Sequence, residues 1–203
     1  MILYMIRHGE TGMNRKKVLQ GRSNMPLSEE GIRQAEEAGA YFRSRGIRFR
    51  EVWSSPLTRA VQTAEIIAGT ETAVHTDERL LEMDYGPYEG MSLMPPTPEL
   101  MTFFSDFVHN PAPEGMEPLP DVVKRTGHFL KDLAESAAAF CQNDSGNNRD
   151  NILISTHAIA MKGLLEYLTP DSGGSYWSKY IGNCGIYRSE MRDGSFSVPE
   201  EVI

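Results

Sequence analysis

The chain has 203 residues, of which 40% are hydrophobic, so it can bury one substantial core. Its formal net charge of -8 argues against a nucleic-acid partner, because binding to a phosphate backbone needs a basic face. The sequence contains no signal-peptide pattern and no apolar run of membrane-spanning length, so we expect a cytoplasmic protein without membrane contact.

Segments typical of strands and helices alternate along the chain. In chain order, the hydrophobic patterns predict strand 2–6, helix 28–45, strand 51–54, helix 55–68, strand 73–76, helix 99–108, helix 120–141, strand 151–155, helix 159–168 and strand 185–191. Such alternation predicts an α/β fold with a mainly parallel central sheet and helices on both faces. We expect a single domain over 1–203, with a helical and loop insert at about 83–120 over the active site.

Three details refine these boundaries. Ser28 is a candidate N-cap for its helix, and Gly46 marks the end of that helix. Ser55 is expected to be the N-cap of the next helix, with Pro56 as its first residue. The polar stretch 143–151 is typical of an exposed turn.

Polar side chains follow three of the predicted strands at the point where each strand ends. Arg7 and His8 follow the first strand, Arg59 lies shortly after the second, and Thr156 and His157 follow the strand at 151–155. The carboxyl ends of parallel strands lie at one edge of a sheet, where ligands bind in open α/β folds. Arginine forks and helix N-termini both suit phosphate oxygens. The pattern predicts a phosphate pocket that contains an imidazole.

Each of these residues also has a structural interpretation. Alone, His157 would be a hydrogen-bonded polar residue, and Arg59 alone would be a solvated helix residue. The remaining histidines lie outside the three strand ends and are expected to be structural or surface residues: His75, His109 and His128.

No metal site and no nucleotide cofactor are expected. Cys141 and Cys184 lie far apart and form no C-x-x-C pair, and no H-x-x-x-H occurs. Arginines beside the histidines would also repel a cation. Glycine-rich nucleotide-binding loops are absent from the sequence.

Six motifs in order resemble those of the histidine phosphatase superfamily, in its phosphoglycerate-mutase-like branch. They are Arg7-His8-Gly9-Glu10-Thr11 with Asn14, Gln20-Gly21-Arg22, Pro26-Leu27-Ser28-Glu29-Glu30-Gly31 with Gln34-Ala35, Ser54-Ser55-Pro56-Leu57-Thr58-Arg59-Ala60 with Gln62-Thr63-Ala64, Leu80-Leu81-Glu82 with Gly86 and Glu89-Gly90, and Ser155-Thr156-His157. The resemblance implies a three-layer α/β domain and a phosphohistidine intermediate.

The resemblance also implies roles for individual residues. His8 would be the nucleophile, and Glu82 would give a proton to the leaving oxygen and then activate water. His157, expected to be cationic beside phosphate, would complete the catalytic set. The phosphate- and substrate-binding set would comprise Arg7, Arg59, Asn14, Gln20, the Gly21 backbone and Ala158. Ala158 stands where the family often has glycine, and its backbone N–H is retained.

The same resemblance leaves hydrolase and mutase open, and the residues favour hydrolysis. Residues 83–123 contain no lysine or arginine that could hold a second phosphate, and the insert is too short for a lid that excludes water. Phosphoglycerate mutase-type transfer and a non-catalytic phosphate-binding module are the alternatives. The expected partner is a small phosphorylated metabolite, its identity is open, and a homodimer is compatible with the sequence.

Overall fold

A computed structural model describes residues 1–69, 72–141, 151–192 and 195–203. Its described strands form one sheet in the order β3-β2-β4-β1-β5-β6, and β7 pairs with β5. The strands are β1 (Ile2–Arg7), β2 (Glu51–Ser54), β3 (Val74–Thr76), β4 (Asn151–Thr156), β5 (Ile186–Arg192), β6 (Ser195–Phe196) and β7 (Glu200–Glu201). β1 to β4 are mutually parallel, whereas β5 runs antiparallel to β1, so the sheet is mixed.

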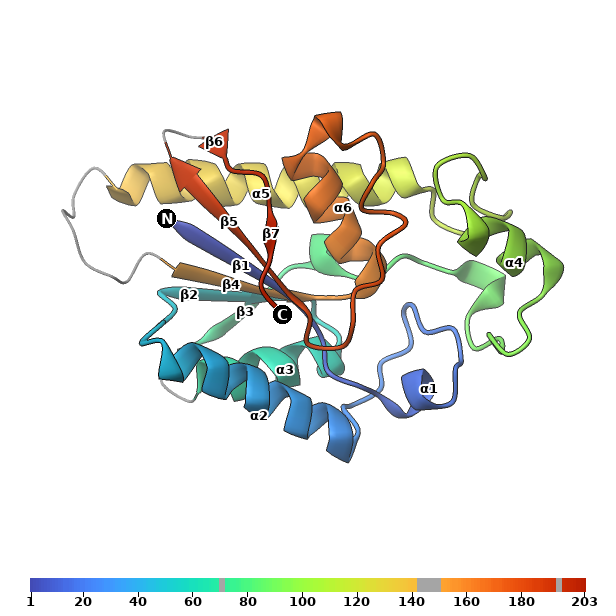
Figure 1. Ribbon diagram of the computed structural model, residues 1–203, viewed down its shortest axis with the longest axis horizontal. Coiled ribbons are helices and arrows are strands. Elements are labelled where there is room, and N and C mark those ends of the chain that lie inside the picture. Colours follow the sequence, from blue (N-terminus) through green and yellow to red (C-terminus); the bar gives the residue numbers. More distant parts are fainter. Residues whose placement is uncertain (70–71, 142–150, 193–194) are drawn as a thin grey trace.

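Helices cover both faces of this sheet, which confirms the predicted α/β layers (Figure 1). The α-helices are α1 (Gly12–Arg15), α2 (Glu29–Ser44), α3 (Thr58–Ala68), α4 (Pro98–Ser105), α5 (Leu119–Cys141) and α6 (Ala158–Leu168). The described residues also form the short 3-10 helices η1 (Glu78–Leu80), η2 (Gly86–Tyr88) and η3 (Pro170–Ser172). Figure 1 shows α2 and α3 below the sheet and α5 and α6 above it.

Alternation along β1 explains why both faces are covered. Leu3 and Met5 pack into the core cluster shared with α5 and α6, whereas Tyr4 and Ile6 pack into the cluster shared with α2 and α3. Successive side chains of a strand point to opposite faces, so a continuous apolar strand needs a helix layer on each side.

Most predicted elements are present, and some boundaries differ. α3 begins at Thr58, with Leu57 in the cap position, so the expected cap at Ser55 and Pro56 is wrong. The Ser55 hydroxyl instead lies 2.7 Å from a ring nitrogen of His157. The helix predicted over 99–108 ends at Ser105. Of the polar turn predicted over 143–151, all but the last residue lies outside the described residues.

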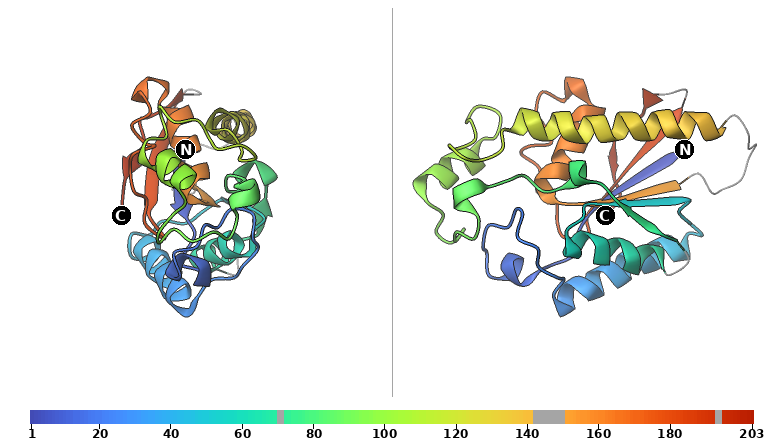
Figure 2. Two further views of the ribbon diagram at one scale, coloured as in Figure 1. Left: turned by 90° about the vertical axis from the view of Figure 1, so that its right-hand side faces the viewer. Right: turned by 180° about the vertical axis from the view of Figure 1, so that it is seen from behind.

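The insert packs against the end of the sheet rather than over either face. Its η2 and α4 lie beyond the carboxyl ends of the parallel strands, on the same side as α1 (Figure 2). A separate apolar cluster joins Phe103 of the insert to Ile159 of α6 and to Trp177. Within the described part of the chain, the helices are not long and apolar enough to cross a bilayer.

The loop that follows β1 is pressed against the start of α2 by backbone contact. A Cβ added at Gly31 would lie 2.1 Å from the Glu10 carbonyl oxygen, and one at Gly9 would lie 2.4 Å from the Gly31 carbonyl oxygen. Only glycine at both positions allows this approach, which fixes the position of the residues after β1.

Gly31→Ala tests this contact. We expect a loss of about 1–3 kcal/mol in the free energy of unfolding, measured in urea, because overpacking outweighs the gain in helix propensity. Gly12→Ala is the matched control, since a Cβ there meets nothing within 4 Å. Equal stability of the two variants would contradict the contact.

Candidate active site

The structure brings the three predicted strand ends together. Arg7 aligns with Thr156 across β1 and β4, and Ser54 aligns with Ser155 across β2 and β4. The rings of His8 and His157 consequently lie with their centroids 5.1 Å apart. Arg59, from the first turn of α3, places its Nε 3.1 Å from Nε2 of His8. The side chains therefore converge at the sheet edge where the sequence predicted them.

His8 is buried and held in one tautomer. Its Nδ1 lies 2.7 Å from the Gly9 carbonyl oxygen, which can only accept, so Nδ1 carries the proton. Nε2 is then an unprotonated acceptor for the Arg59 Nε–H. Burial, and then the charges of Arg59 and Arg7, lower the pKa of His8 well below 6.5. A neutral imidazole with a free Nε2 lone pair is the form needed for a nucleophile.

Arg59 is fully buried and organises the loop beside His8. Its two terminal nitrogens donate to the carbonyl oxygens of Ser23 and Gly21, at 2.7 and 2.8 Å. Burial lowers the pKa of Arg59 to about 10, opposed by the nearby charges of Glu82 and Glu89. The guanidinium therefore stays charged at neutral pH in a site with little water, where its charge acts strongly on a neighbouring anion.

His157 is also buried, and its ring is oriented by Ser55. Burial, and then Arg59, lower the pKa of His157 well below 6.5, so the resting form is neutral. The expectation of a cationic His157 concerns its phosphate complex and stays a prediction. The other ring nitrogen, Nδ1, is buried and has no hydrogen-bond partner in the described part of the chain.

Three unpartnered polar atoms mark what this site can bind. Among the described residues, Arg7 Nε, Gln20 Nε2 and His157 Nδ1 are buried without a hydrogen-bond partner. Two of them are obligate donors, and buried donors in proteins are normally satisfied. The Arg7 side chain donates through Nη1 to the Ile181 carbonyl oxygen, and the Gln20 side chain accepts from Thr11. A tetrahedral oxyanion offers the several acceptor oxygens that such a set needs.

Glu82 lies at the N-terminus of α6. Its Oε1 accepts from the backbone amides of Met83, Ile159 and Ala160 at 2.9–3.1 Å, whereas Oε2 has a single longer bond of 3.2 Å to the Ile159 amide. Helix N-termini stabilise carboxylates through their unpaired N–H groups and dipole. Oε1 therefore holds the carboxylate in place, whereas Oε2 has room for a further hydrogen-bond partner.

The remaining predicted binding residues are arranged around this centre. The Gly21 amide donates to Glu89, whose carboxylate also accepts from the Arg22 and Ser23 amides. Thr11 caps α1: its hydroxyl accepts from the Asn14 amide, and the Asn14 side chain accepts from the Thr11 amide. The roles of Gly21, Asn14 and Ala158 toward a phosphoryl group stay predictions.

Sequence reasoning missed the segment before β5. The Asn183 side-chain amide donates to the His8 carbonyl oxygen at 3.0 Å, and the Cys184 amide donates to the Arg7 carbonyl oxygen at 3.1 Å. Because β5 is antiparallel to β1, its beginning lies beside the end of β1. The polar run Gly182-Asn183-Cys184-Gly185 is the turn signal that could have indicated this neighbour.

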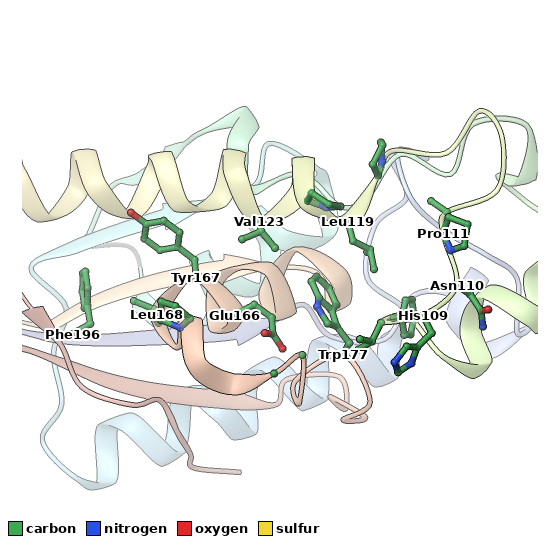
Figure 3. A pocket seen from close by; sticks show the side chains of 18 of the residues that line it. His109, Asn110, Pro111, Leu119, Val123, Glu166, Tyr167, Leu168, Trp177 and Phe196 are labelled. Carbon is green, nitrogen blue, oxygen red and sulfur yellow. The ribbon is translucent and has the colours of Figure 1, made fainter.

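A wide hollow of the described structure lies elsewhere. A mostly apolar groove of about 1160 Å³ runs between the 107–123 segment, the end of α6 and Phe196. Figure 3 shows Trp177 and Tyr167 among its lining side chains. None of the candidate catalytic residues lines it. Among the described residues, no group of three His, Cys, Asp or Glu side chains has metal-binding geometry.

A family model of the histidine phosphatase superfamily (branch 1) matches residues 3–201. The chain belongs to this superfamily. The match covers almost the whole chain and confirms the resemblance carried by the six motifs. In this histidine phosphatase fold, the loop that carries His8 follows β1 and packs against α2 and α3.

Curated relatives of this histidine phosphatase include both hydrolases and mutases by name. It is 28% identical over 192 residues, 93% of this chain and 89% of the relative, to a putative phosphoserine phosphatase 2 of Hydrogenobacter thermophilus. It is 30% identical over 206 residues, 99% and 90% of the two chains, to a probable phosphoglycerate mutase GpmB of Yersinia pestis.

Solved structures agree with the fold. A phosphoserine phosphatase mutant from Entamoeba histolytica, in complex with phosphoserine, superposes with a TM-score of 0.78 at 27% identity. The alignment covers 100% of this chain and 95% of that one. Another structure of a phosphoserine phosphatase from that organism, in complex with 3-phosphoglyceric acid, has a TM-score of 0.77 at 27% identity over the same coverage.

The two buried histidines predict a pH-dependent stability. Both folded pKa values lie well below the unfolded value of 6.5, so below pH 6.5 the unfolded chain binds protons that the folded protein does not. The free energy of unfolding therefore decreases as the pH is lowered below 6.5, by at most about 1.4 kcal/mol per pH unit for each histidine. Above pH 6.5 the two histidines cause no such loss. His157→Gln should therefore reduce the loss between pH 6.5 and 5.5, measured by urea unfolding.

The exposed His128 on α5 supplies the control. His128→Gln should leave the pH dependence of stability as in the wild type. A His157→Gln variant with the wild-type pH dependence would contradict the assignment of a buried neutral imidazole.

Proposed function

We propose that this histidine phosphatase hydrolyses small phosphomonoesters through a phosphohistidine on His8. The observation that carries the proposal is the buried, neutral His8, whose Nε2 lone pair faces Arg59 while its Nδ1–H is held by the Gly9 carbonyl oxygen. Two side chains with unpartnered nitrogens lie close to His8, since the charge of Arg7 acts on it and the His157 ring centroid is 5.1 Å away. Gln20, with a third such nitrogen, is held by Thr11 in the loop that follows. Phosphoryl transfer needs mainly position and positive charge, and both are available here.

In the first step, Nε2 of His8 attacks phosphorus and forms a P–N bond as the P–O bond to the leaving group breaks. The Arg59 Nε–H, which now donates to Nε2, turns to a phosphoryl oxygen and frees the lone pair. Arg7, Asn14, Gln20, His157 and the Ala158 backbone N–H complete the proposed phosphoryl-binding set. The Gly21 amide, which here donates to Glu89, would join this set only by leaving that carboxylate. Protonated Glu82 gives its proton, on Oε2, to the leaving oxygen.

In the second step, water attacks the phosphorus of phosphohistidine. Glu82, now a carboxylate, takes one proton from that water as the new P–O bond forms. The P–N bond breaks and returns the electron pair to Nε2, so inorganic phosphate leaves and His8 is neutral again. One carboxyl group serves as acid in the first step and as base in the second, because the first step leaves it deprotonated.

The insert supports hydrolysis over phosphoglycerate mutase-type transfer. From Met83 to Val123 there is no lysine or arginine, so this wall offers no cation for a second phosphate dianion. A mutase must also shield its phosphohistidine from water. The name of the Yersinia relative keeps the mutase as the second candidate, and conversion between 2- and 3-phosphoglycerate without phosphate release would favour it.

A p-nitrophenyl phosphate assay between pH 5 and 8, with and without EDTA, tests the nucleophile. We expect hydrolysis that EDTA leaves intact and that His8→Ala lowers by about 10³-fold or more. Equal activity of His8→Ala would remove His8 as nucleophile, and loss with EDTA would indicate a metal enzyme. An inactive wild type that still binds phosphate would favour the non-catalytic binding module.

Glu82→Gln tests the proton donor. The alkoxide leaving from glycerol 3-phosphate needs a proton, whereas nitrophenolate leaves readily without one. We expect Glu82→Gln to lower the single-turnover rate of glycerol 3-phosphate cleavage at least about tenfold more than the rate of nitrophenolate release from p-nitrophenyl phosphate. Equal losses on the two substrates would contradict the acid role.

A further inference from the structure

The three residues that precede the proposed proton donor have their backbone carbonyls bound by side chains. Nη1 of Arg125, on α5, donates to the carbonyl oxygens of Arg79 and Leu81 at 2.7 and 2.6 Å. The Thr156 hydroxyl donates to the carbonyl oxygen between them, that of Leu80, at 2.7 Å. One guanidinium group thus supplies two of the three bonds. The chain therefore approaches the proton donor along a fixed path.

Arg125 is itself oriented by Glu117, at the end of the insert. The Arg125 Nε–H donates to Oε1 of Glu117 at 2.7 Å, and Nη2 donates to Oε2 at 3.1 Å. The two side chains are only 17% and 14% exposed. A bidentate arginine–carboxylate pair fixes orientation as well as distance, and it is stronger away from water. Nη1 is therefore presented to the two carbonyl oxygens in one orientation.

Glu117 binds the chain on the other side of Glu82. Its Oε2 accepts from the Asp84 amide at 3.1 Å, and its own amide donates to the Asp84 carbonyl oxygen at 2.8 Å. A single ion pair therefore holds the backbone before Glu82, through Arg125, and after Glu82, through Glu117. The Glu82 carboxylate is fixed separately, because its Oε1 accepts from amides at the start of α6.

We propose that Arg125, oriented by Glu117, is a positioning residue that sets the distance between Oε2 of Glu82 and the leaving oxygen of the substrate. This inference rests on the proposed phosphatase function and deepens its proton-transfer step. A proton donor must lie about 2.6–3.2 Å from the oxygen it serves. A displacement of about 1 Å can lower a rate about 100-fold. Within the described part of the chain, Arg125 hydrogen-bonds only to Glu117 and to two backbone oxygens, so these bonds act on the reaction through Glu82.

Arg125→Met tests this placement in single turnovers at saturating enzyme. The rate of glycerol 3-phosphate cleavage should fall about 10- to 100-fold, and at least about fivefold more than nitrophenolate release from p-nitrophenyl phosphate, because only the alkoxide needs a proton. The apparent Kd of both substrates should change less than about threefold, since the phosphoryl-binding side chains keep their contacts. Arg125→Lys should recover part of the rate on glycerol 3-phosphate, because it keeps the charge and loses the fork.

The Glu82→Gln background separates an effect through Glu82 from a direct one. Adding Arg125→Met to Glu82→Gln should cause no further selective loss on glycerol 3-phosphate, because the group that Arg125 positions is already inactive. Asp132→Asn is the matched control. It breaks an exposed ion pair between Asp132 of α5 and Arg79 of η1, and should leave both rates within about twofold of the wild type.

Glu117→Gln is a milder second variant, for the case that Arg125→Met does not fold. It keeps the shape of the side chain and an oxygen for the Asp84 amide, but it removes the charge that orients Arg125. We expect a selective loss on glycerol 3-phosphate of about three- to tenfold, with urea unfolding as the check that the variant is folded under assay conditions.

A folded Arg125→Met or Glu117→Gln variant whose losses are equal on the two substrates, or absent, would overturn the proposal. Equal losses would indicate a packing role or an effect on His157, whose pKa is lowered first by burial and then by charges that include Arg125. A selective loss that persists in the Glu82→Gln background would also overturn it. If Glu82→Gln alone shows equal losses, the proposed acid role fails, and this inference falls with it.

Discussion

The buried guanidinium of Arg59 is the interaction on which the rest of this site depends. It joins Nε2 of His8 to the carbonyl oxygens of Gly21 and Ser23, with no exposure to solvent. A buried charge is tolerated only when it is paired or hydrogen-bonded. The sheet, α3 and the 21–23 loop together supply those partners. Burial, and then this charge, lower the pKa values of both histidines and keep their imidazoles neutral.

The negative charges of the site come from two glutamates, Glu82 and Glu89. Glu82 ends at the N-terminus of α6, and Glu89 binds the amides of residues 21–23. Each carboxylate thus accepts hydrogen bonds from backbone N–H groups, and its charge also acts on Arg59. The two glutamates differ in freedom, because Glu89 is saturated by donors whereas one oxygen of Glu82 is only weakly held. That difference makes Glu82, rather than Glu89, suited to moving protons.

The segments around the candidate site differ from its centre in charge. The insert carries acidic side chains but no lysine or arginine between Met83 and Val123. The apolar groove, where Figure 3 shows Trp177, is lined by none of the candidate catalytic residues. In folds that host many substrates, the residues that surround a site vary while its centre performs the chemistry.

The sequence by itself determined the family, the α/β layers and the residues at the three parallel strand ends, because local apolar runs and ordered motifs are properties of short segments. Tertiary structure decided what depends on contacts between distant segments. Asn183 reaches His8 only because β5 runs antiparallel beside β1, and Ser55 orients His157 instead of capping α3. Arg125 was not singled out, since a helical arginine is usually solvated and only its bonds to Glu117 and the Leu81 carbonyl oxygen place it beside the Glu82 segment. Strand direction and burial are set by the whole chain, which is why these residues could not be assigned from local pattern.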